Sequence, residues 1–123
     1  MEIKPDYHEA YYDWGIALYD LAKLKRDEAL FHHRFQKYRK AVEVKPDYHE
    51  AYYNWGIALY DLAELKGNES LYEQAIQKYQ KAVEIKPDKH EVYYNWGNAL
   101  YDLAKLKEDE SLCEQAIQKY QKA

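Results

Sequence analysis

The sequence predicts an all-α protein, an α–α superhelix of three helix-turn-helix repeats stacked as a solenoid in a single domain. The first observation is a 41-residue pattern that occurs three times, with Lys-Pro-Asp at 4–6, 45–47 and 86–88 and Trp-Gly at 14–15, 55–56 and 96–97. The second is that apolar residues in each copy recur at spacings of three and four, as amphipathic helices require. The third is that only 3 prolines and 4 glycines interrupt 123 residues, which favours helix.

The first helix of each repeat is expected to begin at the Lys-Pro-Asp motif. Pro46 cannot continue a preceding helix, Asp47 is a favourable N-cap, and Glu50 follows three residues later, as in a capping box. A glycine in mid-helix costs about 1 kcal/mol relative to alanine, so Gly56 indicates the close approach of another helix. The apolar face of this helix comprises Tyr52, Trp55, Ala58, Leu59, Leu62 and Leu65.

The second helix of each repeat follows a short turn. Gly67 is expected at C′, Asn68 or Ser70 at the next N-cap, and Ser70 with Glu73 forms another capping-box pattern. Helices of this length are marginal alone, so stacking of repeats is needed to bury their apolar stripes. The repeats are expected at about 5–45, 46–86 and 87–123. The stripe of the second helix comprises Leu71, Ala75, Ile76, Tyr79, Ala82 and Val83.

These residues resemble the tetratricopeptide repeat family. The resemblance covers the whole chain, but the family repeat has 34 residues, so the period of 41 leaves seven additional ones within "DLAELKGNES". We interpret them as a lengthened first helix and a shifted turn. The second repeat matches the family pattern at Tyr52, Trp55, Gly56, Leu59, Ala75, Tyr79, Ala82 and Pro87, and the third at Tyr93, Trp96, Gly97, Leu100, Ala116, Tyr120 and Ala123.

The resemblance implies a protein–protein interaction scaffold whose first helices line a concave groove for a peptide segment of a partner. Two interpretations of the groove positions stay open: ordinary solvated faces kept alike by duplication, or an aromatic, acidic groove that prefers a basic or proline-containing peptide. Recognition of a terminal carboxylate by Lys and Arg is not expected, since no groove position is basic. The positions are Tyr12, Tyr53 and Tyr94; Asp13, Asn54 and Asn95; Ile16, Ile57 and Asn98; Tyr19, Tyr60 and Tyr101; and Asp20, Asp61 and Asp102.

Other functions are less well supported by the sequence. A net charge of −4 disfavours nucleic acid and anionic membranes as partners. The single cysteine, Cys113, cannot form an internal disulfide, which favours a cytoplasmic location. No catalytic or phosphate-binding motif is present, so neither an enzyme nor a cofactor is expected. The three Trp-Gly tryptophans are expected in the core, and His8, His49 and His90 on solvated faces one repeat apart, too distant to share a metal.

The stretch "ALFHHRF" at 29–35 departs from the pattern of the other copies. Adjacent histidines point about 100° apart on a helix and cannot easily chelate one metal, so no metal site is expected. Arg34 stands where Ala75 stands in the second repeat and is too large for a helix contact. Arg26 and Ala29 replace the turn residues Gly67 and Ser70, leaving Asp27 as the one candidate cap. The hypothesis is that the first hairpin opens into one helix over about residues 7–44.

An opened hairpin predicts the alternative function, a self-associating or domain-swapped structural repeat with no retained ligand. Both ends of the chain fall at one phase of the repeat, which suggests a segment of a longer or engineered array. A homodimer or an end-to-end oligomer is expected. The residues expected to mediate this association are Arg26, Ala29, Phe31, Arg34, Phe35, Leu112, Ile117 and Tyr120.

Overall fold

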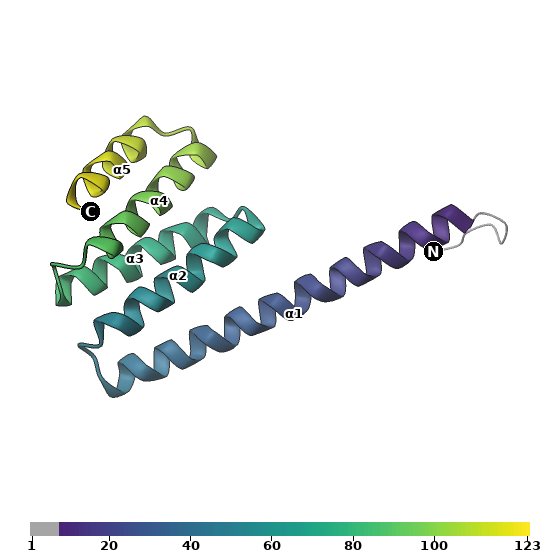
Figure 1. Ribbon diagram of the computed structural model, residues 1–123, viewed down its shortest axis with the longest axis horizontal. Coiled ribbons are helices and arrows are strands. Elements are labelled where there is room, and N and C mark those ends of the chain that lie inside the picture. Colours follow the sequence, from purple (N-terminus) through teal and green to yellow (C-terminus); the bar gives the residue numbers. More distant parts are fainter. Residues whose placement is uncertain (1–7) are drawn as a thin grey trace.

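A computed structural model describes the backbone of residues 8–123, and the side chains of this range except those at 8–11, 13, 15, 18–20, 22, 23 and 26. The described range is helical with short connections and contains no strand, which confirms the all-α class. Two antiparallel hairpins, α2 with α3 and α4 with α5, stack side by side, and one end of α1 packs on α2 (Figure 1). The helices are α1 (His8–Val44), α2 (His49–Lys66), α3 (Glu69–Ile85), α4 (His90–Lys107) and α5 (Glu110–Lys122).

The first hairpin is open. α1 runs without interruption for 37 residues, straight through the positions where the other repeats turn. This confirms the hypothesis of one long helix, and it places Asp27 inside the helix, so its assignment as a cap is wrong. The N-terminal half of α1 extends beyond the rest of the molecule (Figure 1), whereas the C-terminal half packs against α2 as α3 packs against α4.

The two turns that do form show which sequence differences matter. Gly67 has the left-handed φ of 60° expected of it, and Asn68 caps α3 by accepting a hydrogen bond from Leu71 N at 3.1 Å. The next turn, however, places Glu108 in the same conformation, at φ 51°. A missing glycine therefore does not open a turn by itself. Because Ala75 is fully buried, the arginine that replaces it at position 34 is the stronger obstacle to closing the first hairpin.

Some predicted caps are wrong. α2 begins at His49, with Tyr48 as N-cap and no capping side chain, because Asp47 belongs to the preceding turn. In that turn Tyr48 N donates to Lys45 O at 3.1 Å. Ser70 lies inside α3, where its Oγ accepts a hydrogen bond from Gln74 Nε2 at 3.2 Å. Polar residues near a helix start thus bond locally in ways that spacing alone does not distinguish.

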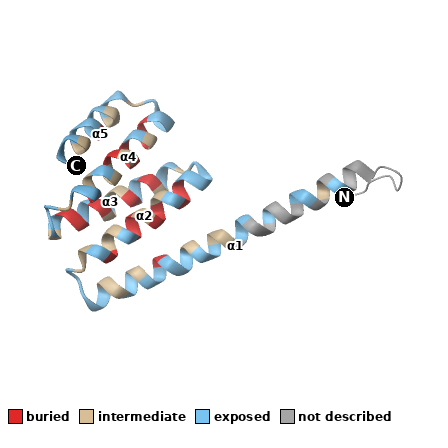
Figure 2. Ribbon diagram, in the orientation of Figure 1, coloured by how far each residue is buried: buried red, intermediate tan, exposed pale blue. Residues whose placement is uncertain are grey.

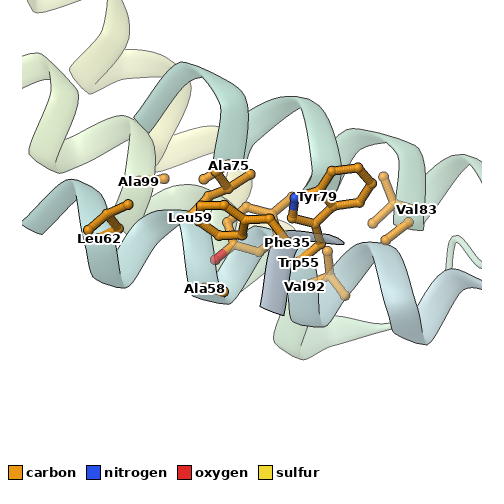
Figure 3. Close-up of a cluster of buried hydrophobic side chains, with 11 residues drawn as sticks. Phe35, Trp55, Ala58, Leu59, Leu62, Ala75, Tyr79, Val83, Val92 and Ala99 are labelled. Atoms are coloured by element: carbon orange, nitrogen blue, oxygen red, sulfur yellow. The ribbon is translucent and has the colours of Figure 1, made fainter. Parts of the chain in front are cut away.

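The core lies where α2, α3 and α4 meet the C-terminal half of α1 (Figure 2). Trp55 and Leu62 are buried there as predicted, and Phe35 joins them from α1 (Figure 3). Leu65 is exposed, so its assignment to the apolar face is wrong. Gly56 is covered by the ring of Tyr79, which confirms a close approach, although the neighbour is a side chain and not a helix backbone.

Candidate interaction surface

α2 and α4 are the first helices of the second and third repeats, and their predicted groove residues bond to one another. Asn95 Nδ2 donates to Tyr53 Oη at 2.7 Å, and the Tyr60 hydroxyl donates to Asp102 Oδ2. Both pairs join α2 to α4 with the same separation of 42 residues. These four side chains form a ladder between neighbouring repeats, so part of the predicted site has a structural role.

Burial favours the protonated form of both tyrosines in the ladder. Burial raises the pKa of Tyr60 well above its ordinary value of 10.0. The hydrogen bond that its hydroxyl donates to the carboxylate of Asp102 raises the pKa further. Burial and the charge of Glu91 also raise the pKa of Tyr53. The neutral hydroxyl of Tyr60 is therefore available as a donor over the whole physiological pH range.

In the second and third repeats, groove residues on both α2 and α4 remain open to solvent, and the exposed aromatic ones lie on α4. Tyr94 and Tyr101 are 55% and 43% exposed, and their separation of seven residues places both on one face of the helix. On α2, Asn54 and Asp61 are exposed, whereas Ile57 packs against the core. Asn98 accepts a hydrogen bond from the Tyr120 hydroxyl at 2.6 Å.

The groove positions on α1 are separated from the others. Tyr12 is 71% exposed and Ile16 is also exposed, both on the part of the helix that extends away from α2. The side chains at positions 13, 19 and 20 lie outside the described residues. The structure thus brings together the groove positions of the second and third repeats, but not those of the first.

Sequence reasoning missed a shallow depression of about 490 Å³ at the end of the ladder, lined by Glu64, Gly67, Tyr72, Asp102, Lys105 and Leu106. Lys105 Nζ lies 3.5 Å from Asp102 Oδ1 and 4.7 Å from the centre of the Tyr101 ring. A cation therefore already lies among the predicted groove residues. The signal was present in the sequence, because Lys105 replaces Glu64 of the preceding repeat.

Asp61 is an exposed acidic group at this surface. Burial and the neighbouring Glu64 raise the pKa of its carboxyl, while the positive charge of Arg34 lowers it. Arg34 itself is exposed, with its guanidinium 5.8 Å from the centre of the Phe31 ring. The residue that disturbs the first hairpin therefore also reaches the edge of the candidate surface.

The residues expected to mediate self-association have varied environments. Phe35 is buried against α2 and Phe31 is half-buried beside it, whereas Ala29 is exposed. On α5, Leu112 and Tyr120 are half-buried and Ile117 is exposed. The side chain at position 26 lies outside the described residues.

The histidines and the cysteine make local contacts. His49 Nε2 lies 3.6 Å from Glu50 Oε1, and His90 Nδ1 lies 3.2 Å from Lys122 O. Cys113 is half-buried. Among the described residues, no three His, Cys, Asp or Glu side chains are grouped as metal ligands would be. None of the described helices is long and apolar enough to cross a membrane.

Comparison with known proteins gives matches in the C-terminal part of the chain. A family model described as TPR repeat matches residues 71–103. A second one, described as Tetratricopeptide repeat, matches residues 91–123. The two matches overlap and together span α3, α4 and α5. Comparison with curated proteins finds no match.

Proposed function

We propose that the surface formed by α2 and α4 binds a peptide segment of a partner protein, on the premise that residues 71–123 match the tetratricopeptide repeat family. Repeats of this family mediate protein–protein interaction and are typically non-enzymatic scaffolds. Function in such a scaffold depends on which side chains the first helices present to solvent. The proposal therefore concerns α4 above all, where the open aromatic residues lie.

The observation that carries the proposal is the exposure of Tyr94 and Tyr101 on one face of α4. Tyrosine offers a large contact area at low conformational-entropy cost and has a hydroxyl for hydrogen bonding. Asp61 is exposed on the neighbouring helix α2, and Glu64 lines the depression together with Asp102. Aromatic rings beside carboxylates favour a basic or proline-containing peptide, because cations and proline rings both pack well on tyrosine.

The test uses a fluorescent peptide of about 12 residues that alternates lysine and proline, with a glutamate-for-lysine peptide as the charge control. The double variant Tyr94→Ser/Tyr101→Ser should weaken binding at least tenfold, since aromatic anchors dominate such interfaces. Ile117→Ser is the matched control, because it removes an exposed apolar residue from α5. Equal binding by the double variant, or equal binding of the acidic peptide, would contradict the proposal.

Self-association is the second candidate function, and the continuity of α1 favours it. Tyr12, Ile16, Leu21 and Leu24 are exposed along the extended half of this helix. Exposed apolar surface of this kind favours association, and Ile117 on α5 offers a further contact for end-to-end stacking. Light scattering should then give a mass above 14.8 kDa. A monomer at every concentration would contradict this candidate.

A further inference from the structure

We infer that the first half of α1 binds a second copy of this chain in one specific antiparallel register. The inference rests on the second candidate function and names its partner and geometry. Residues 8–25 of α1 are called here the leading segment, and residues 30–44 the trailing segment. In the inferred dimer, the leading segment of each copy packs on the trailing segment and on α2 of the other copy.

The first support is that the leading segment and α2 have nearly the same sequence but different environments. The leading segment is a near copy of α2, with 41 residues between corresponding positions. Leu62 of α2 is 1% exposed in the core, whereas its counterpart Leu21 is 49% exposed. Ala58 is buried and its counterpart Ala17 is exposed. Leu21 and Ala17 of the leading segment are thus exposed at positions whose counterparts in α2 pack against a second helix.

The second support is a glycine–tyrosine pair. Tyr79 covers Gly56, and Tyr120 covers Gly97 in the same way, each ring lying within 2.6 Å of where a Cβ would be. The first repeat keeps both members as Gly15 and Tyr38. Within one continuous helix these two positions are about 35 Å apart, given a rise of about 1.5 Å per residue. Tyr38 of a second copy can reach this glycine while α1 stays continuous.

The third support is the ladder between first helices. Tyr53 with Asn95 and Tyr60 with Asp102 join α2 to α4. One repeat earlier, the same positions are Tyr12 with Asn54 and Tyr19 with Asp61. Asn54 and Asp61 are exposed on the edge of α2. A leading segment from a second copy, placed beside α2, would supply the two tyrosines that continue the ladder.

Two chains are enough to form both glycine–tyrosine pairs. Positions 15 and 38 lie on opposite sides of the middle of α1, which spans residues 8–44, at nearly the same distance from it. A two-fold axis near residues 26 and 27 therefore pairs Gly15 with Tyr38 of the partner and Tyr38 with Gly15 of the partner at once. An interface of this kind is isologous and closed, so it leads to a dimer and not to a filament.

Arg34 is the departure from the template that is hardest to pack, because its counterparts Ala75 and Ala116 are buried. In the inferred register it lies opposite positions 19 and 20 of the second copy, where Tyr19 and Asp20 stand. Arg34 already lowers the pKa of Asp61 on its own α2. In the dimer its charge would thus have two carboxyl groups nearby, one from each copy, which offsets the poor steric fit.

The experiment combines mass with cross-linking, in a Cys113→Ser background. Sedimentation should give twice the chain mass of 14.8 kDa at micromolar concentration. The variant Gly15→Cys/Tyr38→Cys, treated with a short bis-maleimide, should run as a covalent dimer. The matched control Lys25→Cys/Tyr38→Cys should stay uncoupled, because position 25 lies about 15 Å along the helix from position 15, which pairs with position 38.

Two further variants distinguish the inferred register from association in any other register. Gly15→Ala should weaken the dimer at least tenfold, because its methyl group meets Tyr38 of the partner. The quadruple variant Arg26→Gly/Asp27→Asn/Ala29→Ser/Arg34→Ala restores the residues of the second repeat and should give a monomer with a closed hairpin.

The outcomes distinguish the inference from the proposals on which it rests. A monomeric wild type overturns both the register and self-association. A dimer that fails to cross-link through positions 15 and 38, or that tolerates Gly15→Ala, overturns the register alone. Binding of peptide at Tyr94 and Tyr101 is measured separately and does not depend on either result.

Discussion

Tyr79 lies flat against Gly56, with its Cε1 atom 2.6 Å from the point that a Cβ on Gly56 would occupy. The ring is 1% exposed and belongs to the core shared by α1, α2, α3 and α4. The same relation between Tyr120 and Gly97 recurs one repeat later. The glycine in the middle of each first helix is therefore explained by a ring from the second helix, which needs the space that any side chain would fill.

This relation predicts that Gly56→Ala destabilises the fold, although alanine normally stabilises a helix by about 1 kcal/mol relative to glycine. Overpacking against Tyr79 should cost about 1–3 kcal/mol, more than the gain in helix propensity. Urea denaturation measures the difference. In a Tyr79→Leu background the same change should cost much less, and a stabilised Gly56→Ala single variant would show that the ring yields freely.

The two left-handed turn residues predict opposite effects of exchanging their side chains. Glu108 has φ 51° and Gly67 has φ 60°, and a residue with a Cβ pays about 1–2 kcal/mol in this region. Glu108→Gly should therefore stabilise the protein by about 1 kcal/mol, and Gly67→Glu should destabilise it by a similar amount. Thermal unfolding of both variants checks this, and two changes of the same sign would contradict it.

Buried tyrosines predict a loss of stability at alkaline pH. Burial raises the pKa of Tyr79 far above its ordinary value of 10.0, and the charges of Tyr53 and Asp61 raise it further. The unfolded chain thus releases this proton near pH 10 while the folded chain keeps it, so the contribution to stability is complete below pH 10 and falls above it. The decline should reach about 1.4 kcal/mol per pH unit for one such group.

Tyr79→Phe should flatten the fall in unfolding free energy between pH 10 and 11.5, because phenylalanine has no proton to release. Tyr101→Phe is the matched control, since Tyr101 is exposed to solvent. If both variants followed the wild-type curve, Tyr79 would not be the group responsible.

The ladder between repeats predicts a modest coupling of α2 to α4. Tyr60→Phe removes the hydroxyl that donates to Asp102 and leaves that carboxylate with Lys105, 3.5 Å away, as its neighbour. The loss should be about 1 kcal/mol, the usual net value of one hydrogen bond. Asp102→Asn measured alone and together with Tyr60→Phe gives a double-mutant cycle, and a coupling energy near zero would contradict the structural role of this pair.

Much of the fold could be predicted from the sequence because the repeat supplies three concordant copies of each signal. The helix class, the core position of Trp55 and the turn at Gly67 all follow from local pattern. Caps were predicted less well, since Asp47 and Ser70 have local hydrogen-bond partners that spacing does not reveal. The contacts that join neighbouring repeats were predicted least well.

The candidate surface likewise depends on contacts between repeats that the sequence pattern does not reveal. Its positions could be read from the family pattern, but the pairing of Tyr60 with Asp102 depends on how two repeats sit side by side. Lys105 enters the surface for the same reason. Arg34 was correctly recognised as a misfit, because a large charged residue at a position that is alanine in both other copies stands out in sequence alone.

The distance between spin labels on the two halves of α1 measures directly whether the first hairpin is open. Labels on Asp13→Cys and Lys40→Cys, in a Cys113→Ser background diluted with unlabelled chains, report the distance within one chain. A continuous helix predicts about 40 Å for these 27 residues. A closed hairpin, with helix axes about 8–10 Å apart, would give less than about 20 Å. That result would contradict a continuous α1 and an open first hairpin.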